Sequence, residues 1–271
     1  RKLGYLGPGR LRADGLAFST LISKGETQRQ AHVALRQMIS EWLVDHEEHL
    51  LSEENILGTT RHRQVFGEGS VLYPNAVARL NRLLAFMGNP EVELFLAVRD
   101  PAEFVTSAYG QQLRSGSGMD IDRYVRGIRV RDLSWARLAH ELLSCRGVIR
   151  LVCWRYEDYA RLRPRLLAEM LGPECAAIVP EAGWSNSGIS AEAYTAFVDM
   201  ALTDLETPIP ELLRAACLAH PKAHGKPGMR PLRRRVYAAS QIAYERDLAV
   251  LARFDRVSLL TPEARSDEDT G

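Results

Sequence analysis

Apolar residues along the chain gather in short runs that are separated by segments with helical spacing. The clearest run covers residues 92–98, VELFLAV, where a single acid interrupts the apolar positions. A run of this kind is typical of a parallel strand that is covered on both faces. Residues 148–154 and 257–260 form similar runs, and Leu50 and Leu51 end a shorter one. We expect these runs to be strands, with residues 92–98 as a central strand.

Between the runs, hydrophobic residues recur every three or four positions, which indicates amphipathic helices. In residues 28–47, for example, Leu35, Ile39 and Trp42 fall on one face. The helices predicted in this way cover residues 28–47, 75–87, 121–128, 133–145, 164–171, 190–204, 209–219 and 231–253, and one more begins at residue 101. Strands that alternate with helices imply a helix-rich α/β fold with three layers around a mostly parallel central sheet.

The remaining segments are expected to be irregular. Residues 1–27 are rich in Gly and Arg and are predicted to be a surface segment. Residues 58–73 are predicted to be a polar loop, and residues 263–271 a frayed tail. No linker divides the 271 residues, so a single domain is expected.

The segment that follows the strand at 92–98 combines a cation with the start of a helix. Arg99 ends the strand, Asp100 can cap the next helix, Pro101 suits its first position, and Glu103 stands where a capping-box carboxylate would. Ser107 lies eight residues after Arg99. A cation at the carboxyl end of a strand, beside a helix N-terminus, favours an anion site. The alternative is that Arg99 simply pairs with Asp100 or Glu103 and that Ser107 is an ordinary helical serine.

Composition and charge limit the possible partners. The chain is 46% hydrophobic and 25% charged, with a formal net charge of +1, so no global field recruits nucleic acid or a membrane surface. The four cysteines form no CxxC pair, which favours a reducing compartment and neither a disulfide framework nor a zinc site. No apolar run approaches the ~20 residues that span a bilayer. We expect a cytoplasmic protein without a metal site, whose anion site is local.

Four short motifs resemble those of sulfotransferases that use 3′-phosphoadenosine 5′-phosphosulfate (PAPS). Arg99, Pro101 and Ser107 match the segment that binds the 3′-phosphate in that family. Bacterial sulfotransferase-like proteins also carry a Leu-x-Ser-x-Glu strand end, an Arg-Tyr-Glu strand end and an Asn-x-Ser stretch, and residues 50–54, 155–157 and 186–190 are similar to these. The resemblance covers roughly residues 48–190. It implies a P-loop-type fold, PAPS as co-substrate, and a 3′-phosphate held by Arg99 and Ser107.

The resemblance also implies a reaction, the transfer of a sulfuryl group to a hydroxyl of a carbohydrate or small metabolite. The family's Lys-x-Gly-Thr-Thr loop, which holds the 5′-phosphosulfate, does not occur in these 271 residues. Because the first residue is Arg1 rather than Met, we expect an N-terminally incomplete domain that is inactive alone. Arg230 lies in a basic, glycine-containing segment that is a loose analogue of a second 3′-phosphate contact in the family, although a solvated basic face is the simpler interpretation.

The sequence offers two candidates for the base that accepts the proton of the acceptor hydroxyl. Glu53 and Glu54 follow a strand end, where at most one of them faces the cleft, and Glu53 is preferred. His62, between Arg61 and Arg63, is the second candidate. A solvated pair of acids and an exposed loop histidine remain the simpler interpretations.

Two other functions stay open at this point. A non-catalytic relative could keep the fold as a binding or interaction module. A kinase with a related P-loop fold would need a Gly-x-x-x-x-Gly-Lys-Ser/Thr loop upstream and an acidic magnesium ligand at a strand end. The oligomeric state and the identity of the acceptor are not encoded in any motif.

Overall fold

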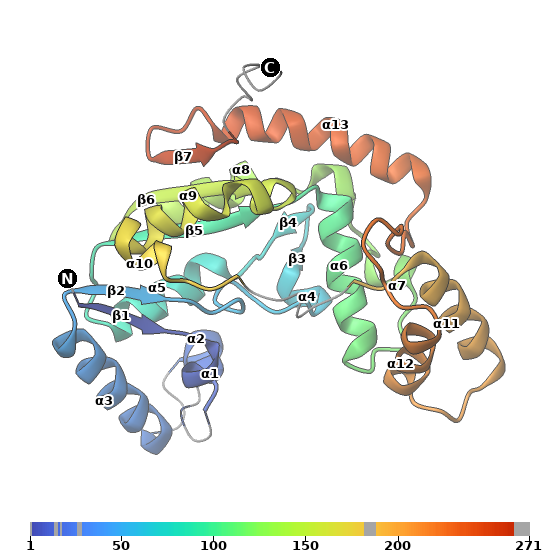
Figure 1. Ribbon diagram of the computed structural model, residues 1–271, viewed down its shortest axis with the longest axis horizontal. Helices are drawn as coiled ribbons and strands as arrows, with labels where there is room; N and C mark the ends of the chain where they lie inside the picture. The colour runs from blue at the N-terminus through green and yellow to red at the C-terminus, as the bar shows by residue number, and fades with distance from the viewer. Residues whose placement is uncertain (1, 14–15, 17, 26–28, 182–187, 263–271) are drawn as a thin grey trace.

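The computed structural model describes residues 2–13, 16, 18–25, 29–181 and 188–262 (Figure 1). The protein is a helix-rich α/β structure whose strands form three separate small sheets. The strands, in sheet order, are the parallel pair β1 (Leu3–Leu6) and β2 (Glu48–Leu51), the antiparallel pair β3 (Phe66–Gly67) and β4 (Val71–Leu72), and the parallel sheet β5 (Val92–Val98), β6 (Val148–Arg155) and β7 (Val257–Leu260).

Most of the helices agree with the predicted periodicity. In chain order they are α1 (Pro8–Leu11), α2 (Phe18–Lys24), α3 (Arg29–Asp45), α4 (His62–Val65), α5 (Ala76–Phe86), α6 (Pro101–Arg114), α7 (Ile121–Tyr124), η1 (Val130–Asp132), α8 (Trp135–Leu143), η2 (Tyr156–Asp158), α9 (Tyr159–Leu171), α10 (Pro173–Ala177), α11 (Ala191–Thr203), α12 (Ile209–Ala219) and α13 (Arg234–Leu251). Two predicted bounds were wrong. Helix α7 ends early, before a turn at Gly127 with φ +79°, and α9 begins five residues before Pro164 and keeps that proline inside it.

Helices cover both faces of the sheet β5-β6-β7, and alternate residues of β5 divide between them. Leu94 and Leu96 pack with residues of α8 and α13 on one face. Phe95 and Ala97 pack with Leu162 and Leu166 of α9 on the other face. This sheet therefore lies between two helical layers, as the α/β prediction required.

The position of β5 corrects one prediction. β5 was expected to be a central strand, but it is the outer strand of its sheet, and residues 94–97 are only half-buried. Strand β2, the last strand of the other parallel pair, also has one edge without a partner among the described strands. Figure 1 shows the parallel strands following one another as β1, β2, β5, β6 and β7 from bottom to top, with their arrows pointing the same way. An apolar run indicates that side chains on both faces of a strand are covered. It says nothing about whether the backbone of the strand is paired on both edges, so the pattern could not reveal the open edge.

The N-terminal region corrects a second prediction. Residues 1–27 were expected to be a surface segment, yet they supply β1, α1 and α2. Their buried side chains form a cluster with α3 and α5, whose members include Leu6, Leu11, Phe18, Ile22, Leu35, Ile39, Trp42 and Phe86. A four-residue strand and a four-residue helix are too short to show a period, so the sequence pattern missed them.

Two further segments complete the comparison with the sequence. Residues 58–73 were expected to be a polar loop, but they contain α4 and the β3–β4 hairpin. The predicted tail at 263–271 lies outside the described residues. Among the residues that are described, no helix combines the length and the apolar character needed to cross a bilayer.

Candidate functional site

Arg99 stands at the carboxyl end of β5, and no acid among the described residues forms an ion pair with it. Its guanidinium carbon lies 4.8 Å from the centre of the Tyr156 ring, and its Nε is buried and has no hydrogen-bond partner in the described part of the chain. Its backbone carbonyl accepts a 2.7 Å hydrogen bond from the indole N–H of Trp135. The cation is thus held by a ring and by its backbone rather than by a carboxylate.

The acids that could have neutralised Arg99 are engaged elsewhere. Asp100 caps α6, because its Oδ1 accepts from Ala102 N at 2.8 Å and from Glu103 N at 3.2 Å. The Oδ1 of Asp100 also accepts a 3.0 Å bond from the fully buried hydroxyl of Ser240, which ties α13 to this helix start. Glu103 pairs with Arg230 at 3.3 Å. The simple pairing of Arg99 with Asp100 or Glu103 therefore does not occur.

Asp100 was predicted correctly as the cap of α6. The carboxylate that accepts from the N–H of Asp100, however, comes from another element than α6. The expected capping-box residue, Glu103, faces Arg230 instead of the backbone. The N–H of Asp100 donates to Oε1 of Glu157, at the end of β6, at 3.1 Å. Glu157 also accepts from the hydroxyl of Tyr244 at 3.4 Å. Two strand ends and two helices are joined by this network.

Ser107 belongs to α6, and Arg230 contacts the same helix through Glu103. Ser107 is exposed, one turn after Glu103 on the same helix. Arg230 is 59% exposed, and its guanidinium carbon lies 4.0 Å from the centre of the Tyr237 ring. No hydrogen bond or ion pair within the described residues connects Arg99 to either of them. Their convergence on one phosphate stays a prediction.

Glu53 is buried at the end of β2 and is fully occupied. Its two oxygens accept from Arg12 Nε at 2.9 Å and from Arg12 Nη2 at 2.6 Å, and Oε1 also accepts from the backbone and side-chain nitrogens of Asn55. Burial raises the pKa of this carboxyl, but the hydrogen bonds from Arg12 and Asn55 outweigh burial and lower the pKa below its ordinary value. Arg12 also binds Glu54 at 2.8 Å. A carboxylate so stabilised is a weak base.

His62 begins α4 and is held by one ring nitrogen. Its Nδ1 lies 2.5 Å from the carbonyl oxygen of Tyr124, and its ring packs edge-on against Phe66 and Tyr124. A carbonyl can only accept, so Nδ1 carries a proton, and Nε2 is the ring nitrogen left as a possible acceptor. His62 therefore stays a candidate base through Nε2, whereas both oxygens of Glu53 are engaged by Arg12 and Asn55.

Several residues that shape this region carry no signal in the local sequence. Tyr156 and Glu157 were noted only as part of a strand-end motif, and Trp135, Ser240 and Arg12 were not noted at all. The partner of Glu53 could not be found from spacing, because 41 residues separate it from Arg12. Of the Asn-x-Ser stretch at residues 186–190, residues 186 and 187 lie outside the described residues, and Ser190 caps α11. Among the residues that the structure describes, no three or more His, Cys, Asp or Glu side chains form a cluster that could bind a metal ion.

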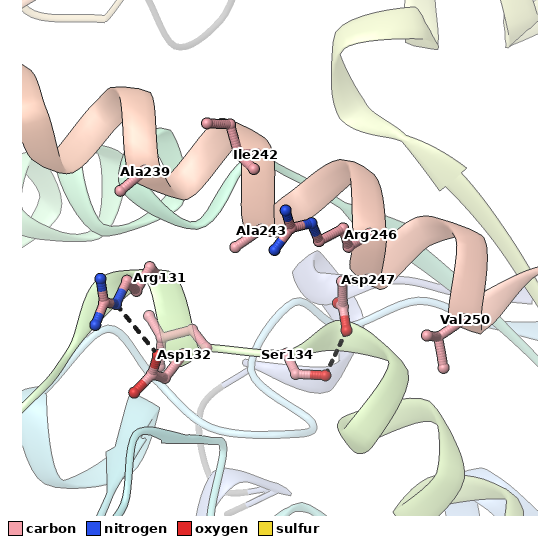
Figure 2. A pocket seen from close by; sticks show the side chains of 10 residues that line it. Arg131, Asp132, Ser134, Ala239, Ile242, Ala243, Arg246, Asp247 and Val250 are labelled. Atoms are coloured by element: carbon pink, nitrogen blue, oxygen red, sulfur yellow. Dashed lines mark hydrogen bonds and ion pairs between the residues drawn. The ribbon is translucent and has the colours of Figure 1, made fainter.

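A groove of about 570 Å³ runs between η1 and α13, away from the predicted site residues (Figure 2). Asp247 of α13 closes the start of α8 there. Its Oδ1 accepts from the hydroxyl of Ser134 at 2.5 Å, and its Oδ2 accepts from the backbone nitrogens of Trp135 and Ala136. These three bonds hold the carboxylate in place, so we assign it a structural role at the start of α8, where Ser134 is the N-cap.

No protein-family model, no curated protein and no solved structure matches this chain. A function for it has to be inferred from its own residues.

Proposed function

We propose that this chain is the nucleotide-binding part of a PAPS-dependent sulfotransferase. The observation that carries the proposal is the state of Arg99, which is half-buried at a strand end and has no acidic partner among the described residues. A desolvated cation is costly unless an anion meets it, and the start of α6 beside it also favours negative charge. A phosphate group supplies the bidentate acceptor that a guanidinium fits best.

The open strand edges support a P-loop-type fold. β2 and β5 each have an edge without a partner in the described chain, and they are neighbours in the order seen in Figure 1. One parallel strand placed between them would join the two parallel sheets into one. Its following loop would then lie between Glu53 and Arg99. We propose that a strand from outside these 271 residues takes this place and carries the family's 5′-phosphosulfate loop.

In this proposal the residues divide the chemistry as follows. Arg99 and Ser107 hold the 3′-phosphate of the nucleotide. The acceptor hydroxyl of a carbohydrate or small metabolite attacks sulfur, the bond between sulfur and the phosphate oxygen breaks, and the hydroxyl proton passes to Nε2 of His62. Glu53 serves to hold Arg12 and the start of α1 rather than to move a proton. Arg230 keeps its predicted phosphate contact only by leaving Glu103.

A non-catalytic relative with the same fold is the second candidate. The observation that favours it is the Arg12–Glu53 pair, which closes the carboxyl end of β2 with a bidentate ion pair of 2.6 and 2.9 Å. Such a chain would bind a nucleotide or partner without transferring a sulfuryl group.

Calorimetric titration with two nucleotides tests the proposal on the 271-residue chain. Adenosine 3′,5′-bisphosphate should bind more tightly than adenosine 5′-monophosphate, although both bind weakly because the 5′-phosphosulfate loop is missing. Arg99→Gln should remove most of the difference, a loss of about ten- to a hundredfold for the bisphosphate, since each charge-assisted bond contributes about 1.5–3 kcal/mol. The 5′-monophosphate should be little affected.

Two outcomes would overturn the phosphate assignment. Equal losses for both nucleotides would show that Arg99 acts on the fold rather than on the 3′-phosphate. An unchanged preference in the Arg99→Gln variant would place the 3′-phosphate elsewhere. Sulfuryl transfer from PAPS by the 271-residue chain would contradict the requirement for an additional loop.

A further inference from the structure

Two stacks of arginine on tyrosine line a second cavity, along the first half of α13. Arg230 lies over Tyr237 at 4.0 Å, and Arg155, the last residue of β6, lies over Tyr244 at 5.6 Å. The two tyrosines are seven residues apart, so they share one face of the helix and their positions differ by about 10.5 Å along its axis. The cavity has a volume of about 680 Å³, within the range of small-ligand pockets.

Each of the two arginines contacts a tyrosine ring and makes only long ion pairs with acids of the described residues. Arg230 lies 3.3 Å from Glu103, and Arg155 lies 3.5 Å from Glu245 and 3.8 Å from Asp158. None of these pairs has hydrogen-bond geometry in the described structure, and the Nε of Arg155 is buried without a hydrogen-bond partner. Elsewhere, arginines such as Arg12 and Arg150 reach their glutamates at 2.6 and 2.7 Å. The stacked guanidinium groups are therefore fixed in place while their donors remain poorly used.

The acids of the cavity fall into two kinds. Asp100 and Glu157 already accept bonds from the backbone of α6 and from Ser240 and Tyr244, so their charge is compensated. Glu103 and Glu245 are 35% and 53% exposed and make only the loose pairs described above. They can turn aside for an incoming anion or accept bonds from hydroxyl groups.

We infer that this cavity binds an acidic oligosaccharide. Each Arg–Tyr stack receives one anionic group of the ligand, and the sugar hydroxyls between them bond to Glu103, Glu245 and Gln241, which line the same space. The cavity is lined by both arginines and acids. A ligand with hydroxyl groups, which donate and accept hydrogen bonds, as well as anionic groups therefore suits it better than a simple anion does. The inference stands independently of the proposed function, because neither Arg99 nor His62 lines this cavity.

Arg99 and Arg155 lie on opposite faces of the sheet, so these two residues can test the two sites separately, whereas Arg230, which the proposed function also gives a phosphate contact, cannot. By the alternation along β5, Arg99 is on the same face of the sheet as Phe95 and Ala97, and it stacks on Tyr156. The side chain of Arg155 is on the same face of the sheet as that of Cys153, and it stacks on Tyr244 of α13. A change at one arginine should leave the other site intact.

A calorimetric comparison of three sugars tests the inference on the 271-residue chain. Hyaluronan tetrasaccharide, which carries a carboxylate on every second sugar, is expected to bind with a Kd of about 0.1–1 mM. Glucuronate, with one carboxylate, should bind at least about tenfold more weakly because it reaches only one stack. Chitotetraose, the uncharged counterpart, should give no binding.

Point variants then assign the binding to the two stacks. Arg155→Gln and Arg230→Gln should each weaken hyaluronan binding about tenfold or more. Arg155→Lys should weaken it similarly, because lysine keeps the charge but loses the planar stack. Arg234→Gln, which changes an exposed arginine of the same cavity, should cost less than about twofold, and Arg99→Gln should have no effect. Thermal melts of all variants report whether they fold.

Three results would overturn the saccharide site. These are equal binding of chitotetraose and hyaluronan, full hyaluronan binding by folded Arg155→Gln and Arg230→Gln variants, and no hyaluronan binding at about ten times the expected upper Kd. Hyaluronan binding could depend on Arg155 while adenosine 3′,5′-bisphosphate binds no more tightly than adenosine 5′-monophosphate. That result would uphold this site and overturn only the proposed function. The reverse result would overturn only the saccharide site.

Discussion

The ends of β2 and β5 carry the same kind of feature, a charged residue just after a parallel strand, but the structure treats them differently. At the end of β2, Glu53 is buried and bonded to Arg12 and Asn55. At the end of β5, Arg99 is half-buried, rests on a tyrosine ring and forms no ion pair with a carboxylate of the described chain. A charge at a strand end points to a ligand only where the chain itself has not neutralised it.

The sharpest way to break this contrast is to remove the charge of Glu53. Glu53→Gln should lower the free energy of unfolding by about 2 kcal/mol, because a buried carboxylate with charge-assisted bonds is lost while Arg12, which is 43% exposed, can still reach water. The melting temperature should fall by about 4–8 °C for a chain of this size. Thermal unfolding followed by circular dichroism measures the change.

Glu54→Gln is the matched control for that variant. Glu54 contacts the same arginine at 2.8 Å, but its side chain is 75% exposed. We expect a loss below about 0.5 kcal/mol, as for other exposed pairs. Equal destabilisation by the two substitutions would mean that burial does not distinguish Glu53.

The pH dependence of stability should separate the two strand ends further. The pKa of Glu53 is lowered in the folded protein, so its stabilisation is complete above the ordinary value of 4.5 and is lost as the pH falls through the folded pKa. The difference in melting temperature between wild type and Glu53→Gln should be constant near neutral pH and shrink below about pH 4.5. A difference that is unchanged at pH 3 would contradict a charged, bonded Glu53.

The smallest expected effect on stability is that of Arg99→Gln. No ion pair of the described residues is lost, and the bond from Trp135 goes to the backbone carbonyl, which the substitution keeps. The free energy of unfolding should change by less than about 0.5 kcal/mol in either direction. Chemical denaturation measures it, and a loss as large as that of Glu53→Gln would make Arg99 a structural residue.

The parts of the fold that could be read from the sequence are those set by local pattern. β5, β6 and β7 lie where the apolar runs indicated, and α6 begins at Pro101 with Asp100 as its cap. The run at 92–98 has its character because helices cover both its faces. Local sequence also placed Arg99 at the end of a strand.

The parts that could not be read depend on distant partners. Whether Arg99 is paired or free is decided by Arg230, which takes Glu103, and by Ser240 of α13, which binds Asp100. Whether Glu53 is a base is decided by Arg12, in a segment too short to show a period. Contacts across tens to more than a hundred residues follow from tertiary packing, and no spacing rule describes them.

The half-covered edge of β5 has a practical consequence for work with this chain. Residues 94–97 are apolar and only half-buried, and the backbone donors and acceptors of this edge have no partner strand among the described residues. A long apolar edge of this kind is a template for edge-to-edge pairing between molecules. The 271-residue chain should therefore self-associate as its concentration rises, and a lysine introduced at the exposed edge is the natural means of keeping it monodisperse.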